Sequence, residues 1–573
     1  MLWSYMKESW LYFLVAPLLM VVEVMCDLYQ PTLMANIIDV GVASGDSAYI
    51  VRTAAVMLGV AALGLGGGFG CLYFSAHSTS STGARLRQGL FAHIQAFSCA
   101  ELDRLQTSTL ITRLTNDITQ LQNMLLSCQR ILIRAPLLCI GGLVMAYTLS
   151  PQLSVVFAVA VPIIALVIVV VVRQAFSLFT TVQAKLDRLN VVTRETLLGI
   201  RVIKAFVTQQ RQQDKFEVSN EELLEWNVKA QRLVVLLMPF VTFIGNVAVI
   251  AVLWLGGRYV QAGTLEVGRI MAFITYILQV LQSLLMSMMI MVNISRAKAS
   301  IDRINDVFST EATVAEPADP QPIAGYDLVF DHVYFRYHPH SDWVLQDISF
   351  EAKQGETVGI IGATGSGKSS LVALIPRLYD TVQGQITLGG VDIRQLSLKE
   401  LRRNIAVIMQ DNVLFSGTIA SNLQFGDPKA SEQQMVQILE EAAAEELLSL
   451  SPQGLEAIVA QRGQNLSGGQ KQRLSIARAL IKAPKILIMD DAASALDFAT
   501  EAKLQHNLQQ RLKHCTTILI AQRVSSLMGA DRILVLDGGR IVAQGNHETL
   551  LRECAIYRTI AQTQLGEEAV GHA

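Results

Sequence analysis

The stretch that decides the fold runs from Leu466 to Asp497 and reads LSGGQKQRLSIARALIKAPKILIMDDAASALD. It combines a Gly-Gly turn at the start of a helix, an apolar strand that ends in two carboxylates, and a short acidic loop. The N–H groups at a helix start favour an anion, and carboxylates at a strand end offer oxygen ligands to a metal ion. The stretch therefore suits nucleotide phosphates and their metal ion.

A second stretch, Gly362 to Ser369, reads GATGSGKS and fits the phosphate-binding pattern G-x-x-x-x-G-K-[ST] at every position. The strand-like TVGII precedes it and a helical pattern follows, which is the context that this motif requires. We expect the backbone N–H groups of Gly365 to Ser369 to cradle phosphates. Lys368 would reach the outer phosphates, and the Ser369 hydroxyl would bind Mg²⁺.

The two stretches together resemble the ATP-binding cassette (ABC) transporters, and the resemblance covers nearly the whole chain. LSGGQ, Leu466 to Gln470, matches the signature of that family, and the apolar N-terminal half resembles the six-helix exporter type. The resemblance implies ATP and Mg²⁺ as cofactors. It implies nucleotide contacts from Tyr337, Gly362, Thr364, Gly365, Ser366, Gly367, Lys368, Ser369, Ser370, Ser467, Gly468, Gly469, Gln470 and Asp497.

The resemblance also gives individual side chains a role. Tyr337 would stack on adenine, and Gln410, at the end of the strand IAVIMQ, would touch the metal ion and the attacking water. Asp490 would hold Mg²⁺ through water, because a strand end delivers a carboxylate to the nucleotide crevice. The implied metal ligands are thus Ser369, Gln410 and Asp490.

The signature acts on a different ATP from the one on the chain's own Gly-rich loop. In this family two cassettes sandwich two ATP molecules head to tail, so Ser467 and Gly469 would contact the γ-phosphate on the partner's loop. One chain then cannot complete either site, and the resemblance implies an obligatory dimer.

Two positions depart from the family pattern. The residue after Asp490 is normally a Glu that positions or deprotonates water, but here it is Asp491, which is one methylene shorter. A misplacement of about 1 Å can lower a rate about a hundredfold. The family's switch histidine is replaced by Gln522, which can still hydrogen-bond a phosphate but cannot become a cation.

Both departures would line the same ATP, whereas LSGGQ and the loop Ser494 to Asp497 (SALD), which serve the opposite ATP, are unaltered. This asymmetry resembles heterodimeric exporters in which one site is slow. We therefore expect a second half-transporter that supplies a Glu and a His.

Composition agrees with a membrane-embedded first half. At 573 residues the chain is long enough for about two to three domains. Hydrophobic residues make up 51% and charged residues 16%, which is unusual for a soluble protein. The apolar runs concentrate in the N-terminal half, and the first of them lacks the basic leader of a signal peptide.

A helix needs about 20 apolar residues to cross the bilayer core, and six runs qualify. They are Leu11–Met34, Ile50–Phe74, Ile131–Leu149, Leu153–Val172, Leu233–Leu255 and Ile270–Val292.

The loops after spans two and four are long and rich in Arg and Lys. This predicts that these loops, both termini and the nucleotide domain are cytoplasmic. Within these loops, Ser98–Thr107 and Gly199–Gln209 resemble the family's coupling helices. The expected location is the bacterial plasma membrane.

The predicted fold class is therefore a six-span α-helical transmembrane domain followed by an α/β P-loop ATP-binding cassette with a helical subdomain. The expected boundaries are 1–308 for the transmembrane domain, 309–325 for a Pro- and acid-rich linker, 326–565 for the cassette and 566–573 for a tail.

Two features of the spans concern cargo. Glu23 and Asp27 lie one turn apart in the first span, where a carboxylate costs about 2.5 to 3.5 kcal/mol and should face a cavity or a partner. They either bind a cation or a cationic drug, or they lie near the outer interface or bond neighbouring helices. The last span carries Met286, Met288, Met289 and Met291, which suit either varied apolar ligands or ordinary packing.

Several functions are disfavoured. A net charge of -2 gives no reason to expect a nucleic-acid partner, and seven scattered cysteines without a C-x-x-C indicate neither a disulfide framework nor a zinc site. Six apolar spans exclude a soluble DNA-repair ATPase. An importer is disfavoured because its membrane and ATPase parts are normally separate chains.

The leading hypothesis is ATP-driven multidrug or other amphipathic small-molecule efflux. The alternatives are a lipid, peptide or haem exporter, or a regulatory ATP-binding subunit without turnover.

Overall fold

The computed structural model describes residues 2–450, 452–492 and 496–565. The chain divides into two compact units. The helical unit comprises Met1–Gln95 and Ser108–Ser309, and the α/β unit comprises Ala96–Thr107 and Thr310–Ala573. A short segment from the first long loop therefore belongs to the α/β unit, although it lies between two helices of the other unit in the chain.

The helical unit is built from a few very long helices. Their bounds are α1 (Leu2–Met6), α2 (Trp10–Asn36), α3 (Ser47–Gln95), α5 (Thr107–Thr112), α6 (Ile118–Leu149), α7 (Val155–Leu198), α8 (Ile200–Ala205), α9 (Gln209–Gln261) and α10 (Val267–Ser309). Among the described residues, six helical segments are long and apolar enough to cross a membrane. This confirms the six predicted spans and the fold class.

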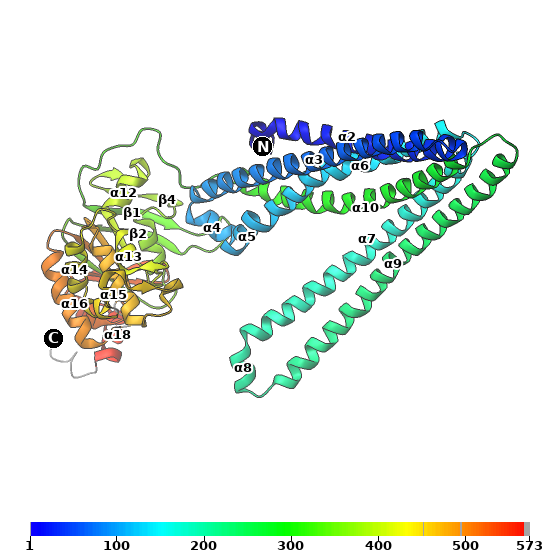
Figure 1. Ribbon diagram of the computed structural model, residues 1–573. Helices are drawn as coiled ribbons and strands as arrows, with labels where there is room; N and C mark the ends of the chain where they lie inside the picture. The colour runs from blue at the N-terminus through cyan, green and yellow to red at the C-terminus, as the bar shows by residue number, and fades with distance from the viewer. Residues whose placement is uncertain (1, 451, 493–495, 566–573) are drawn as a thin grey trace. The chain divides into compact units, whose positions relative to one another are not determined.

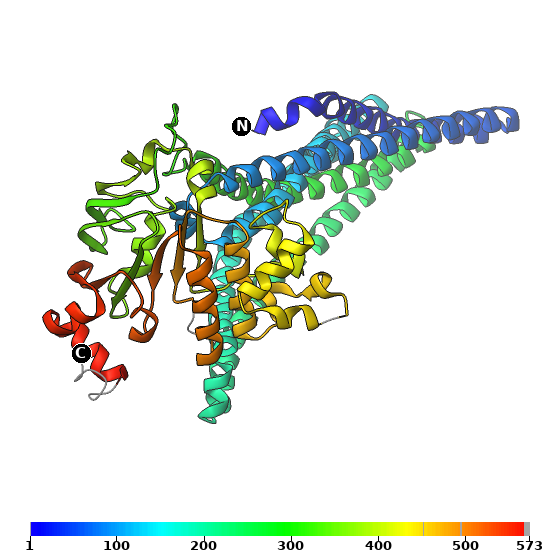
Figure 2. The same ribbon diagram turned by 90° about the vertical axis from the view of Figure 1, so that its left-hand side faces the viewer.

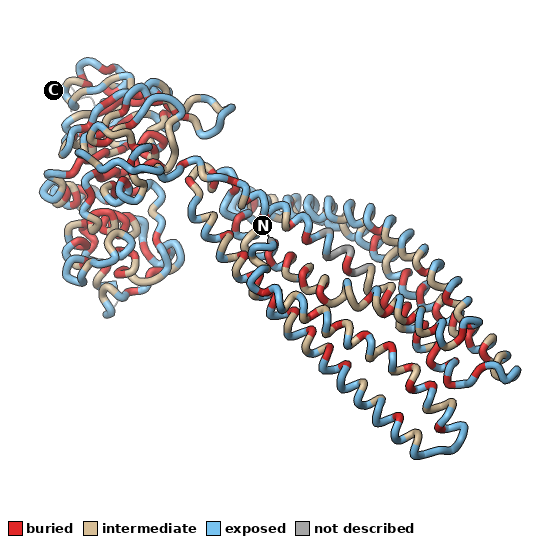
Figure 3. Tube along the Cα trace, turned by 90° about the horizontal axis from the view of Figure 1, so that it is seen from above, coloured by how far each residue is buried: buried red, intermediate tan, exposed pale blue. Residues whose placement is uncertain are grey.

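Helices α2, α3, α6 and α10 run alongside one another, whereas α7 and α9 form a separate long pair joined by α8 (Figure 1). Buried positions recur along the faces where helices meet, and the remaining faces are exposed (Figure 3). Many of the exposed side chains on these helices are large and apolar. Small residues allow the closest contacts: a Cβ atom on Gly67 of α3 would lie only 3.0 Å from the Leu19 carbonyl oxygen of α2. Such close approach of backbones is typical of membrane helices.

The α/β unit contains two main sheets. Its strands are β1 (Leu328–Phe335), β2 (Leu345–Ala352), β3 (Thr357–Gly362), β4 (Gln383–Leu388), β5 (Val391–Asp392), β6 (Ile405–Ile408), β7 (Gly417–Thr418), β8 (Ile458–Val459), β9 (Ile486–Asp490), β10 (Thr516–Ile520), β11 (Arg532–Asp537) and β12 (Arg540–Gly545). Its helices are α4 (Cys99–Leu105), α11 (Lys368–Leu374), α12 (Leu398–Asn404), α13 (Ile419–Gln424), α14 (Glu432–Glu441), α15 (Gly468–Leu480), α16 (Phe498–Arg511), α17 (His547–Glu553) and α18 (Ala555–Leu565).

The six-stranded sheet has the order β12-β11-β3-β10-β9-β6 and is parallel except for β12. The antiparallel sheet β2-β1-β4-β5 shares a core with it, formed by buried side chains such as Phe330, Ile360 and Ile488. β9 reads ILIMD and is buried along its whole length, as expected for a central parallel strand. The parallel strands therefore bring their carboxyl ends to one edge of the sheet.

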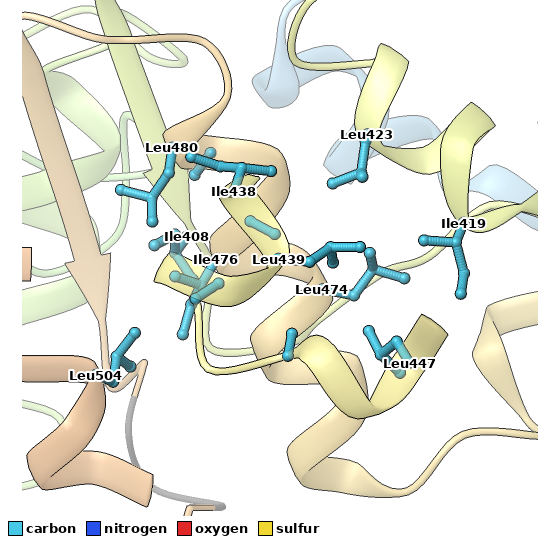
Figure 4. Packing of buried hydrophobic residues seen from close by; sticks show 14 of the residues in the cluster. Ile408, Ile419, Leu423, Ile438, Leu439, Leu447, Leu474, Ile476, Leu480 and Leu504 are labelled. Atoms are coloured by element: carbon cyan, nitrogen blue, oxygen red, sulfur yellow. The ribbon is translucent and has the colours of Figure 1, made fainter. Parts of the chain in front are cut away.

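A helical subdomain made of α13, α14 and α15 has its own core. Apolar side chains recur at helical spacing along α15, and they pack against Ile438 and Leu439 of α14 and Leu423 of α13 (Figure 4). In the α/β unit this subdomain lies apart from the antiparallel sheet, with the orange segment of β9 and α16 between them (Figure 2). The subdomain carries the LSGGQ stretch at the start of α15.

Helix α4 is fastened to the α/β unit by polar contacts at both ends. Ser98 and Glu101 form a capping box at its N-terminus, and Glu101 also accepts the backbone N–H of Thr313 at 3.2 Å. Near its C-terminal end, Arg104 donates to Thr310 Oγ1 at 3.0 Å. The segment that resembles a coupling helix thus packs on the α/β unit of its own chain.

Candidate functional site

Side chains from four parallel strands converge at the carboxyl edge of the six-stranded sheet. Ile520 of β10 pairs with Asp490 of β9, and the Gly-rich loop follows β3 next to β10. A cavity of about 290 Å³ opens at this edge. Its lining includes Thr364, Gly365, Gly367, Lys368, Ser369, Ser370, Gln410, Asp490, Asp491 and Gln522.

The Gly-rich loop has a backbone that only glycine adopts easily. Gly365 and Gly367 have φ angles of +84° and +99°, and a Cβ atom on Gly367 would lie 2.9 Å from the Val344 carbonyl oxygen. Lys368 Nζ donates to the carbonyl oxygens of Gly362 at 2.9 Å and Ala363 at 2.8 Å. The loop therefore wraps around an ammonium group. Burial lowers the pKa of Lys368, and the two nearby aspartates oppose that shift.

Asp490 and Ser369 form the oxygen-rich part of the cavity. Asp490 is almost fully buried and is hydrogen-bonded to the Ser369 side chain. Burial raises the pKa of Asp490, and the Ser369 hydrogen bond and Lys368 counteract this shift. The carboxylate of Asp490, the hydroxyl of Ser369 and the amide of Gln410 all line the cavity, and such oxygen groups fit Mg²⁺, which binds one or two protein oxygens together with phosphates and water.

The two departures from the family pattern lie side by side. Gln522 Nε2 donates to Asp491 Oδ2 at 3.1 Å, and the Asp491 backbone N–H donates to the Ile520 carbonyl at 3.0 Å. Asp491 has φ +52°, a left-handed conformation that Asp tolerates better than most residues. Burial raises the pKa of Asp491.

Tyr337 lies next to the loop rather than in the lining of the cavity. Its hydroxyl shares a hydrogen bond with Ser370 Oγ at 2.8 Å, and its ring meets the rings of Phe335 and Tyr379 edge to face. The residue is 42% exposed. The position allows the stacking role predicted for it, and that role stays a prediction.

The signature residues occupy a different part of the unit. Ser467 caps α15 and accepts the Gln470 N–H at 3.2 Å, while Gln470 Oε1 accepts the Ser467 N–H at 2.9 Å. Gly468 and Gly469 form the first turn of that helix. None of the four lines the cavity described above. Asp497 caps α16, whereas Ser494 and Ala495 lie outside the described residues.

Three contacts of the α/β unit were not anticipated from the sequence. Arg523, next to Gln522, forms an ion pair with Glu501 of α16 at 3.4 Å, and Ser526 Oγ donates to Glu501 at 2.6 Å. The Tyr379 hydroxyl donates to Asp103 of α4 at 2.5 Å. The Tyr379 ring also touches Tyr337, so one side chain joins the predicted adenine contact to α4.

Tyr379→Phe tests whether this link couples ATP hydrolysis to substrate transport. The change keeps the ring but removes the hydrogen bond to Asp103, which is worth about 1 kcal/mol. We expect the assembled transporter to move about threefold to fivefold less substrate per ATP hydrolysed, with ATP affinity unchanged, measured in proteoliposomes. Tyr337→Phe is the matched control, because its hydroxyl bonds Ser370 and not α4. Equal coupling ratios in the two variants would contradict the link.

Comparison with known families identifies the chain. Residues 13–284 match the family described as the ABC transporter transmembrane region, and residues 345–494 match the ABC transporter family. The chain is also 38% identical over 565 residues to YfiB of Bacillus subtilis (strain 168), an uncharacterized ABC transporter ATP-binding protein, covering 99% of this chain and 98% of that protein. The chain belongs to the ABC transporter family.

Two further similarities place this ABC transporter among exporters. It is 31% identical over 508 residues to the ATP-dependent lipid A-core flippase of Syntrophus aciditrophicus (strain SB), covering 88% of this chain and 84% of that protein. The solved structure of a bacterial Atm1-family ABC exporter with ATP bound matches with a TM-score of 0.79 and 25% identity, covering 96% of this chain and 98% of that one. The chain is thus an integral membrane subunit of an ATP-driven exporter.

Proposed function

We propose that this ABC transporter chain is the degenerate-site half of a heterodimeric exporter. Its own Gly-rich loop holds ATP that is hydrolysed slowly, and its LSGGQ completes the active site of a different chain. The observation that carries the proposal is the Gln522–Asp491 hydrogen bond at 3.1 Å, in which an amide and a short carboxylate replace a histidine and a glutamate.

The geometry supports slow chemistry rather than weak binding. Lys368, the glycine-rich backbone and the Ser369–Asp490 pair are all present at the cavity, so they would supply contacts to the phosphates and to Mg²⁺. When bound, Mg²⁺ would neutralise phosphate charge. Asp491 is the residue in place to orient water, but its side chain is short and its Oδ2 accepts a hydrogen bond from Gln522. A glutamine amide cannot change its charge during the reaction as a histidine can.

The requirement for a second chain has two supports. Ser467 and Gly469 lie on α15 and do not line the chain's own cavity, so they are available to another chain's nucleotide. The tip around α8 exposes apolar side chains that include Leu198, Phe206 and Val207, at 82%, 74% and 79%. Exposed apolar clusters of this kind mark interaction sites. We propose that the partner's cassette covers this tip and that both cassettes are cytoplasmic, beneath a bacterial plasma membrane.

The cargo that we propose is an amphipathic small molecule, as in multidrug efflux. The proposal rests on the family resemblance and on the mostly apolar spans, which suit a molecule with an apolar part. The similarity to a lipid A-core flippase keeps a lipid cargo as the second candidate.

Stoichiometry and turnover of the native complex test the proposal. We expect a tagged form of the chain, purified from its own membranes, to carry one equivalent of a different half-transporter with Glu and His at the two positions. That complex should hydrolyse ATP, whereas the chain alone should bind ATP and turn over slowly. A homodimer of this chain with fast ATP-driven transport would refute the proposal.

A further inference from the structure

A cavity of about 360 Å³ lies in the helical unit between α2, α6 and α10. Its lining includes the apolar side chains of Met20, Leu126 and Met286 and the polar side chains of Ser127, Arg130 and Arg134. The volume falls within the range of about 300 to 1,000 Å³ that small-molecule pockets occupy. An apolar wall with a few convergent polar groups is also typical of a ligand site.

The carboxylates of the first span are already paired. Arg134 of α6 donates to Glu23, and it donates to Asp27 Oδ2 at 2.8 Å. Of the alternatives considered for Glu23 and Asp27, the structure therefore shows the bond to a neighbouring helix. A cationic ligand would have to displace a guanidinium that two carboxylates hold.

Arg130 differs from Arg134 in its partners. It lies one turn before Arg134, so both side chains are on one face of α6. Within the described part of the chain, Arg130 has no ion pair or hydrogen bond to another side chain. It directly precedes the apolar run Ile131–Leu149, and it lines a cavity whose walls are largely apolar. No carboxylate among the described residues lines this cavity.

We propose that this cavity binds an amphipathic anion, whose carboxylate or phosphate pairs with Arg130 and whose apolar part lies against Met20, Leu126 and Met286. A guanidinium matches the two oxygens of such a group with two parallel hydrogen bonds. Methionine side chains adapt to apolar groups of varied shape. The inference rests on the proposed exporter function and narrows its substrate class to anions. The side chains of Met288, Met289 and Met291 lie outside the described residues and contribute nothing to it.

A matched pair of fluorescent ligands tests the site. The full chain is placed in phosphatidylcholine nanodiscs and titrated with 11-(dansylamino)undecanoic acid and with its methyl ester. The acid carries a negative carboxylate, whereas the ester is uncharged at the same position. We expect the acid to bind at least about tenfold more tightly than the ester. Arg130→Gln should remove that difference, Arg130→Lys should keep part of it, and Arg173→Gln, on α7 and outside the cavity, should leave it intact.

Equal binding of acid and ester, or an acid affinity that Arg130→Gln leaves unchanged in a variant with an unaltered unfolding temperature, would overturn the proposal. Adding phosphatidylglycerol separates the two sources of anion. Competition in the wild-type chain and not in Arg130→Gln identifies a lipid phosphate as the occupant, whereas no competition identifies a free amphiphile. The titration needs neither ATP nor a partner, so its failure would leave the proposed division of labour between the nucleotide sites intact.

Discussion

The double substitution Asp491→Glu with Gln522→His is expected to raise ATP hydrolysis at this chain's own site about a hundredfold. Glu restores the missing methylene and brings a carboxylate closer to the attacking water. His restores a group that can carry a positive charge and removes the amide that donates to Asp491 Oδ2. The measurement is steady-state ATPase activity of the assembled exporter whose partner site has been inactivated.

Single substitutions separate the two contributions. Asp491→Asn keeps a side chain that tolerates the left-handed backbone at φ +52°. In the complex with an intact partner site it should change the total ATPase activity little, because the proposed slow site would contribute little to that total. Asp491→Glu alone should recover part of the gain, at a stability cost of about 1 kcal/mol from that backbone conformation. If Asp491→Asn instead abolishes most of the activity of the complex, this site is the productive one and the account is wrong.

Replacing Lys368 by Ala is expected to weaken ATP binding to this chain by about a hundredfold or more. The ammonium group donates to two loop carbonyls, and bound phosphate oxygens would be stronger acceptors than these. Two hydrogen bonds to a charged group are worth about 3 kcal/mol or more together, which is a factor of about a hundred in affinity. The measurement is equilibrium binding of Mg-ATP to the purified full chain.

The control for that loss is Lys429→Ala, an exposed lysine outside the cavity that should leave the affinity unchanged. An affinity that Lys368→Ala lowers less than threefold would show that ATP does not use the Gly-rich loop. The proposed slow site would then be wrong, because a site that hydrolyses ATP slowly must first bind ATP.

Much of the architecture could be predicted because its signals are local. Apolar runs long enough to span a bilayer predict six helices. The order of strand, Gly-rich loop and helix predicts that Lys368 lies in a phosphate-binding loop without any tertiary information. A strand end delivers a carboxylate to the nucleotide crevice, which predicts the place of Asp490. The family resemblance implies that Gln522 lines the same ATP, and the cavity does contain Lys368, Asp490 and Gln522.

Contacts between distant side chains could not be predicted in the same way. The sequence places Glu23, Asp27 and Arg134 in apolar spans, and an intramembrane charge demands a partner, yet periodicity does not say which helices are neighbours. The Tyr379–Asp103 bond joins residues 276 positions apart and depends on how α4 packs. The left-handed backbone conformation of Asp491 could not be predicted from the sequence either, although it helps to explain why Asp is accommodated at that position.

The fate of the nucleotide on each chain tests the central claim most directly. The native complex is allowed one round of turnover with 8-azido-ATP labelled at the α- or the γ-phosphate, and each chain is then photolabelled and separated. We predict that this chain keeps both labels, because its ATP stays intact, whereas the partner keeps the α label and loses the γ label. Loss of the γ label from this chain as fast as from its partner would contradict the account.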